Sequence, residues 1–134
     1  MSVTLPNSEH EALLSAARDA RERAYAPYSK FRVGAALDTG DGHVFLGTNV
    51  ENASYGLTMC AERVAIGAAV TAGYRRFVAI AIAGPDGVLT SPCGACRQVL
   101  REFNPEMDVI YTTPDGATQT TLEELLPHSF GPFV

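Results

Sequence analysis

Three cysteines constrain this chain more than any other feature of its sequence. They are Cys60, Cys93 and Cys96, and the last two stand at the Cys-x-x-Cys spacing that lets both sulfurs reach one metal ion. Zinc binds thiolates tetrahedrally; structural sites use four protein ligands, whereas catalytic sites use three and leave one position for water. Three cysteines therefore predict a catalytic zinc site, and they require two distant segments of the chain to meet in the fold.

Two charged residues follow the first cysteine closely. We expect Cys60 to lie in the first turn of a helix, because deeper in a helix a residue two positions on, Glu62, faces another way. Glu62 is then placed to take a proton from metal-activated water and to pass protons to a substrate. Three thiolates leave the zinc site negatively charged, and helix N-termini offset only part of that charge. We therefore predict that Arg63 donates to one or two of the sulfurs.

Other interpretations of the cysteines are open from the residues alone. Cysteine is among the most buried residue types, so all three could be small core residues. Cys93 and Cys96 could form a redox pair, although that leaves Cys60 and Glu62 unexplained. A structural zinc would need a fourth ligand from a histidine, and no histidine has a partner at ligand spacing. The histidines are His10, His43 and His128.

Composition and charge narrow the class of protein. The length of 134 residues suits one domain spanning 1–134. A net charge of −5 with only ten Lys and Arg argues against a nucleic-acid partner and favours a small substrate of little charge. We expect no membrane partner and no signal peptide, because the apolar runs are short and the N-terminus lacks a basic start. An odd number of cysteines then favours the reducing cytoplasm.

The order of predicted elements indicates an α/β fold. Helices are expected at Ser8 to about Tyr25, Cys60–Ala72, Gly94–Phe103 and, as one short turn, from Thr121. Strands are expected at Phe31–Asp38, His43–Thr48, Phe77–Ala83 and Asp108–Thr113, with a weak edge strand near Ala117–Thr120. The second helix has almost no polar face, so we expect it to be buried all round. These units predict a three-layer α/β/α sandwich with a mixed sheet of about five strands.

Several motifs carry a resemblance to a known family over nearly the whole chain. They are Tyr25-Ala-Pro-Tyr-Ser-Lys-Phe31, Asn49-Val-Glu51-Asn-Ala-Ser-Tyr55, Cys60-Ala-Glu-Arg63, Ser91-Pro-Cys-Gly-Ala-Cys-Arg-Gln98 and Glu124-Leu-Leu-Pro127. Cys-x-Glu followed by Pro-Cys-x-x-Cys is a signature already described for zinc deaminases. The chain resembles the small, zinc-dependent cytidine deaminases of nucleoside salvage, and the first cysteine, in place of histidine, matches their homotetrameric branch.

The resemblance implies an activity and a cofactor. The expected reaction is the hydrolytic deamination of cytidine, and of deoxycytidine if nothing reads the 2′-hydroxyl, to uridine or deoxyuridine and ammonia. One zinc ion per subunit, held by the three cysteines, activates the water, and Glu62 shuttles the protons.

The resemblance also implies a set of substrate contacts. Asn49 and Glu51 hold the ribose hydroxyls, which suits a neutral sugar because an amide donates and accepts while a carboxylate accepts. Phe31 lies against the pyrimidine, whereas Tyr55 and Phe130 reach the pocket of a neighbouring subunit in a homotetramer with composite active sites. The full set is Phe31, Asn49, Glu51, Ala61, Tyr55 and Phe130. Without the resemblance, Phe31 would be a core residue, Asn49 a turn former and Glu51 a solvated carboxylate.

Rival functions come from other classes. A deaminase acting on polynucleotides is disfavoured by the acidic charge, and one acting on a nucleoside-like antibiotic is disfavoured by Asn49-Val-Glu51, which suits a free ribose. A non-catalytic zinc-binding domain would hold the metal without turnover.

The apolar tail from Phe130 to Val134 is expected to pack on its own core or on a neighbouring subunit, and the apolar helix around Ile66 also suits an interface.

Overall fold

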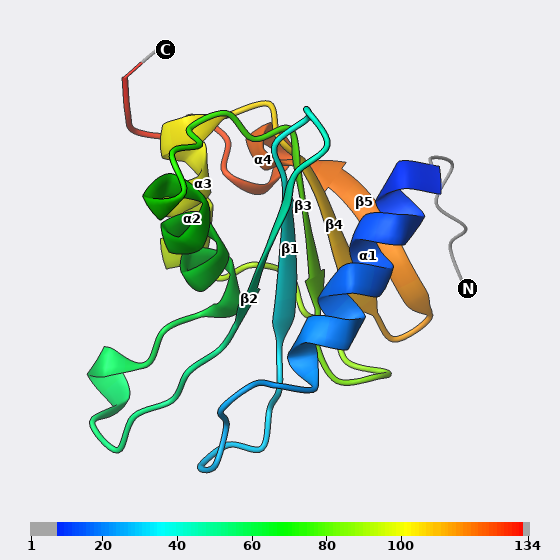
Figure 1. The fold of residues 1–134 in the computed structure, drawn as a ribbon, viewed down its shortest axis with the longest axis vertical. Helices are drawn as coiled ribbons and strands as arrows, with labels where there is room; N and C mark the ends of the chain where they lie inside the picture. Colours follow the sequence, from blue (N-terminus) through cyan, green and yellow to red (C-terminus); the bar gives the residue numbers. More distant parts are fainter. Residues whose placement is uncertain (1–7, 133–134) are drawn as a thin grey trace.

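A five-stranded sheet forms the centre of the fold. In the computed structural model, which describes residues 8–132, the strands lie in the order β2-β1-β3-β4-β5 (Figure 1). They are β1 (Gly34–Asp38), β2 (Val44–Thr48), β3 (Ala79–Ala83), β4 (Asp108–Thr113) and β5 (Gly116–Thr121). β3 and β4 pair in parallel, and the other three pairs are antiparallel. The predicted mixed sheet is confirmed.

Helices cover both faces of the sheet. The helices are α1 (Ser8–Arg21), α2 (Ala61–Thr71), α3 (Gly94–Phe103) and the short α4 (Leu122–Leu125), with α1 on one face and the others on the opposite face (Figure 1). The α1 face packs small side chains such as Ala36 and Ala81, and the opposite face packs Leu37, Ile80 and Val109. Because side chains alternate across a strand, these two clusters make three layers around a fully buried β3.

Two glycines let helices approach the sheet closely. A Cβ atom on Gly34 in β1 would lie 2.0 Å from the carbonyl oxygen of Ala17 in α1. A Cβ atom on Gly47 in β2 would lie 2.3 Å from the carbonyl oxygen of Ala61, at the start of α2. A side chain at Gly47 would therefore displace the first turn of the helix that carries Glu62.

Several element boundaries agree with the sequence. α3 and β4 span the predicted residues, and Cys60 and Ala72 cap α2. Gly73 follows with φ at +99°, the left-handed conformation that ends many helices. Thr121 caps α4 by accepting a hydrogen bond from the Glu124 amide, as its spacing predicts.

The predicted end of the first helix is wrong, and so is the start of the strand after it. α1 ends at Arg21, because the backbone of Tyr25 is used elsewhere: its N–H donates to the Asn49 carbonyl, and its carbonyl accepts from the Glu51 N–H. β1 begins at Gly34 because the preceding backbone bonds to a side chain. The Val33 N–H donates to Asn49 Oδ1, and Asn49 Nδ2 donates to the Phe31 carbonyl.

The expectation that α2 is buried all round is also wrong. Its inner side packs on the sheet and α3, and Ile66 belongs to that core. Its outer side is exposed in this chain, at Gly67, Ala68, Val70 and Thr71. These residues are small or apolar, so composition alone hides the difference between the two sides.

Two expectations concern residues outside the described range. The predicted absence of a signal peptide concerns residues 1–7, and the apolar tail ends at residues 133–134. Within residues 8–132, the helices are all too short or too polar to cross a membrane.

Candidate metal centre and active site

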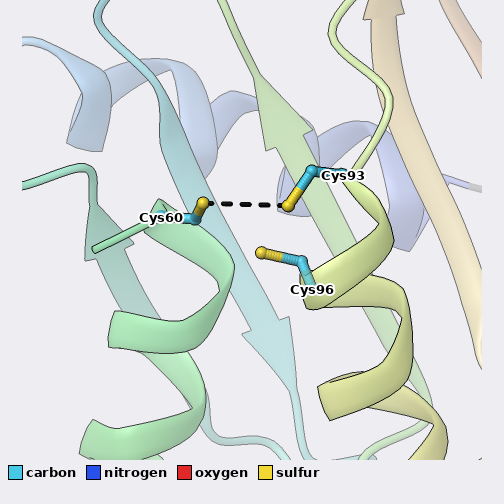
Figure 2. Close-up of side chains that lie close together, drawn as sticks. All are labelled: Cys60, Cys93 and Cys96. Atoms are coloured by element: carbon cyan, nitrogen blue, oxygen red, sulfur yellow. Dashed lines mark hydrogen bonds between the residues drawn. The ribbon is translucent and has the colours of Figure 1, made fainter. Parts of the chain in front are cut away.

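The N-termini of two helices bring the three cysteines together. Cys60 is the N-cap of α2 and Cys93 is the N-cap of α3, and neither side chain is used to cap its helix. Cys96 lies one turn into α3 and is fully buried. Figure 2 shows the three sulfurs turned toward one another between the two helices. The distant segments therefore meet, as a shared metal ion requires.

The spacing of the sulfurs fits a zinc ion. A Zn–S bond of about 2.3 Å in a tetrahedral site places ligand sulfurs about 3.8 Å apart. The Sγ atoms of Cys60 and Cys93 lie 3.9 Å apart, and all three sulfurs lie within 4.8 Å of one another. Three soft thiolates also suit zinc better than magnesium or calcium. The cluster has the donor set and the size of a zinc site.

The histidines belong to other parts of the structure. His10 bonds to Gln119 at 2.9 Å, and His43 bonds to Asp41 at 3.0 Å. Among residues 8–132, the metal-binding group contains the three cysteines and no histidine. Within these residues, no histidine is therefore placed to act as the fourth ligand of the metal. A redox pair would use Cys93 and Cys96 alone, and it still does not account for Cys60.

A cavity of about 230 Å³ lies beside the sulfurs. Four predicted site residues line it together with two of the cysteines: Phe31, Asn49, Ala61 and Glu62. Its other lining residues include Thr58, Thr90 and Ser91, to which the sequence analysis gives no role. Ser91 could have been found from its place in the Pro-Cys motif, whereas Thr90 carries no sequence signal. We call this hollow the cysteine cavity.

Glu62 is the buried carboxyl group of the cysteine cavity. Its side chain is 5% exposed, and it lies in the first turn of α2, next to the Cys60 end of the helix. Burial raises the pKa of the Glu62 carboxyl above its usual range, and the negative charge of Cys60 adds to the rise. A carboxyl group of this kind holds its proton at higher pH than an exposed one, which suits a group that accepts and returns protons.

Arg63 lies against the thiol cluster. Its Nη2 atom donates to Cys60 Sγ at 3.4 Å, as predicted. The pKa of Cys60 is lowered, first by a hydrogen bond from the Cys96 thiol and then by Arg63. The pKa of Cys96 is raised by its bond to Cys60 and by burial. Cysteine binds a metal ion as the thiolate, so metal binding releases the protons that the thiols of the cluster still hold.

Asn49 performs a structural task at the rim of the cysteine cavity. Its side chain is buried, accepts from the Val33 N–H at 2.9 Å and donates to the Phe31 carbonyl at 2.7 Å. One amide hydrogen and one lone pair of Oδ1 are left for a substrate. The same bonds hold Phe31, which is 39% exposed, at the wall of the cavity.

Glu51 and Tyr55 lie in a second hollow. This hollow measures about 390 Å³, is lined also by Tyr28 and Ser29, and shares Thr58 with the cysteine cavity. The Glu51 carboxylate accepts hydrogen bonds from the backbone of both Tyr28 and Ser29 and from the Ser29 hydroxyl. These bonds, the hydroxyl first, lower the pKa of Glu51. We call this hollow the Glu51 pocket.

Phe130 lines neither hollow. Its side chain is 86% exposed, and its carbonyl accepts from Gln98 Nε2 on α3. Larger hollows, of about 480 and 490 Å³, lie elsewhere on the surface, but no metal-binding cluster of the described residues lines them. The candidate metal ligands and the buried carboxyl group therefore lie at the smaller cysteine cavity.

The chain is similar to cytidine deaminases along most of its length. The family described as "Cytidine and deoxycytidylate deaminase zinc-binding region" matches residues 7–113. A cytidine deaminase of Sporosarcina psychrophila is 48% identical over 122 residues, which make up 90% of each chain. A solved cytidine deaminase from Burkholderia pseudomallei is 53% identical with a TM-score of 0.84, covering 90% of this chain and 98% of that one. A solved cytidine deaminase from Mycobacterium tuberculosis is 40% identical with a TM-score of 0.82, covering 94% of this chain and 100% of that one.

These similarities define the class. The chain is an α/β protein with a zinc-binding deaminase site, and it belongs to the cytidine and deoxycytidylate deaminase family.

Proposed function

We propose that this protein is a zinc-dependent hydrolase that converts cytidine, and also deoxycytidine, to the corresponding uracil nucleoside and ammonia in pyrimidine salvage. The observation that carries the proposal is the meeting of three cysteines and Glu62 at one cavity in a chain of the cytidine deaminase family. Cys60, Cys93 and Cys96 would hold the zinc, which when bound acts as a Lewis acid that makes water nucleophilic at neutral pH.

Glu62 moves the protons in this proposal. Its carboxylate takes a proton from the attacking water and gives it to N3 of the cytosine ring. It then carries a second proton, from the hydroxyl now bonded to C4, to the amine on the same carbon; the C4–N bond breaks, ammonia leaves and the C4 carbonyl of the uracil product forms. The burial that raises its pKa matches the carboxyl to this double role, because the group must hold a proton and release it within one turnover.

The walls of the two hollows suit a nucleoside. Phe31 offers a partly exposed ring to the pyrimidine, and Ala61 leaves room beside it. Asn49 keeps one donor and one acceptor position free, and Glu51 accepts from the ribose hydroxyls. Because the Glu51 carboxylate already holds the turn at Tyr28 and Ser29, we infer that a sugar adds to these bonds or replaces some of them.

Arg63 offsets the negative charge of the thiolates in our proposal. Its bond to Cys60 supports this role. We expect Arg63→Gln to shift the rising limb of the pH–rate profile to higher pH, because less positive charge lies beside the metal. An unchanged profile together with unchanged zinc content would contradict the role.

The remaining assignments concern assembly and location. We propose one domain over residues 1–134, a homotetramer and a cytoplasmic location. In this tetramer Tyr55 and Phe130, which are 76% and 86% exposed, reach a neighbour's pocket. The exposed side of α2 is small and apolar, which suits helix-on-helix contact between subunits.

One assay tests the function directly. Purified protein is mixed with cytidine, and the change in ultraviolet absorbance is followed with and without a zinc chelator. We expect turnover that the chelator abolishes and that added zinc restores. Parallel reactions with a cytosine oligonucleotide and with a cytosine-containing nucleoside antibiotic separate the rival substrates. Zinc-loaded protein that turns over none of these would instead be a non-catalytic zinc-binding domain.

A further inference from the structure

We propose that Arg97 is a positioning residue that holds the backbone before Cys93, at the start of α3, against the end of α4. The proposal rests on the proposed zinc site, but it concerns hydrogen bonds that this chain makes itself. Arg97 lies directly after Cys96 and one turn after Cys93. Its side chain bonds to the backbone that leads into Cys93.

The guanidinium group joins two separate stretches of backbone. Nε donates to the Pro92 carbonyl at 2.7 Å, and Nη1 donates to the Leu125 carbonyl at 2.7 Å. Nη2 makes a longer contact of 3.5 Å with the Ser91 hydroxyl, at the wall of the cysteine cavity. One planar side chain thus connects the residue before Cys93 with the last residue of α4.

The position of Cys93 explains why this link matters. As the N-cap of α3, Cys93 is only half inside the helix, so helical hydrogen bonds do not hold the chain that precedes it. Pro92 is fully buried and, as a proline, has no N–H to donate. Upstream, the Thr90 N–H donates to the Thr112 carbonyl, and next to Cys93 the Pro92 carbonyl offers a further anchor, for which Arg97 supplies the donor.

The rest of α3 offers a matched comparison one turn away. Arg101 donates from Nε to the Ser129 hydroxyl at 2.9 Å and from Nη1 to the Pro132 carbonyl at 2.8 Å. It is also an arginine that ties α3 to the C-terminal region, and these two bonds go to Ser129 and Pro132 rather than to the backbone before Cys93. Both arginines lie on α3 and donate hydrogen bonds through their guanidinium groups. They differ in the segments that they bond, because Arg97 reaches the residue before Cys93 and Arg101 reaches Ser129 and Pro132.

Lysine variants test the proposal. Lysine keeps the positive charge but cannot donate along two fixed directions as the guanidinium fork does. Residues that orient metal ligands typically change metal affinity by about 10–100-fold when replaced. We expect Arg97→Lys to speed the release of zinc to a chromogenic chelator by a factor in that range, whereas Arg101→Lys releases zinc as the wild type does. Thermal unfolding of the metal-free proteins is measured alongside.

The outcomes separate this proposal from the proposed function. Zinc release from Arg97→Lys at the wild-type rate overturns the positioning role and leaves the deaminase proposal untouched. Equal acceleration in both variants shows general loosening and also overturns it. A wild-type protein that binds no zinc overturns both proposals.

A measurement on the wild type keeps the test independent of the variant's folding. Zinc is added to chelator-stripped protein, and amide hydrogen exchange is followed. If Arg97 links the two elements, zinc slows exchange in α3 and also at Leu126, whose N–H bonds to Leu122 in α4. Slower exchange in α3 with no change at Leu126 overturns the link.

Discussion

The two hollows of this site are built in different ways. The cysteine cavity lies at the starts of α2 and α3, where Cys60 and Cys93 cap the helices and Glu62 is buried. Loop residues such as Phe31 and Thr58 complete its wall. The Glu51 pocket is formed by the loops that include residues 25–31 and 49–59, where Tyr55 is 76% exposed. The three sulfurs and Glu62, which form the metal side of the site, come together within one chain. The Glu51 pocket, which forms the sugar side, has an aromatic wall residue that stays exposed in that chain.

This difference has a physical consequence. Proton transfer requires a buried carboxyl group held by rigid elements, which a sheet and two helices provide. Recognition of a small, neutral sugar requires enclosure, which one chain with exposed aromatic side chains does not provide. For the homotetramer that we propose, we therefore expect the metal side to tolerate separation of the subunits, and the sugar side to depend on a neighbour.

The largest effect is expected at the buried carboxyl group. Glu62→Gln should lower the turnover number by about a thousandfold or more, because the proton shuttle is lost. Zinc content should stay at one ion per subunit, as measured by metal analysis. Glu102→Gln, at an exposed position of α3, is the control and should behave like the wild type. Substantial activity in Glu62→Gln would remove Glu62 from the mechanism.

Glu62→Gln should also change how the stability of the metal-free protein depends on pH. Burial raises the pKa of Glu62 above the unfolded value of 4.5, so the folded chain binds this proton more tightly. Ionising Glu62 therefore lowers the stability of the metal-free protein as the pH rises from 4.5 through the folded-state pKa. Metal-free Glu62→Gln should unfold at higher urea than wild type at neutral pH, and the difference should vanish below pH 4.5. A constant difference would contradict the raised pKa.

A smaller effect is expected from the exposed tail. Phe130→Ala should raise KM for cytidine by about tenfold or more, as truncation of a buried aromatic contact often does. Zinc binding should not change, because Phe130 lines neither hollow of its own chain. Mixing Phe130→Ala with Glu62→Gln subunits should produce sites with the wild-type KM, since a hybrid site can combine both intact residues. No gain in a hybrid shown to form would mean that Phe130 acts elsewhere.

The next effect is a loss of stability, expected from a substitution where β2 meets α2. A Cβ at Gly47 would lie 2.3 Å from the Ala61 carbonyl oxygen and 2.5 Å from the Ala65 nitrogen. Overpacking of this kind costs about 1–3 kcal/mol, so Gly47→Ala should lower the unfolding midpoint and speed zinc release. Gly94→Ala adds the same methyl group to the first turn of α3, where nothing lies within 4 Å. Equal stability of the two variants would contradict the close approach.

The smallest effect on stability is expected at Glu51. Its hydrogen bonds lower its pKa below the usual 4.5, so the ionised group stabilises the fold above that pH, and the contribution is lost as the pH falls through the folded-state pKa. Metal-free Glu51→Gln should be slightly less stable than wild type at neutral pH, because the group is solvent-exposed and screened. The two proteins should converge at acid pH in urea unfolding. A difference that does not depend on pH would mean that the charge of Glu51 is not what stabilises the turn.

Much of the fold could be predicted from local patterns. β3 is a short run of apolar residues, and such a run is typical of a strand covered on both faces. α3 begins after Pro92-Cys93 and ends before Asn104-Pro105, so both ends have a sequence signal. The end of α1 could not be predicted, because the backbone of Tyr25 pairs with a segment far along the chain.

By itself, the sequence determined the chemistry: which residues could bind zinc, which carboxyl group stood beside them and which family the motifs resembled. Residue types and short spacings carry that information, because ligand preference and the first turn of a helix are local properties. Only the tertiary structure decided that Asn49 is bonded to the backbone of Phe31 and Val33, that α2 exposes one side, and that Arg97 ties Pro92 to Leu125. These features depend on which distant segments become neighbours, and that is set by packing of the whole chain rather than by any short stretch of it.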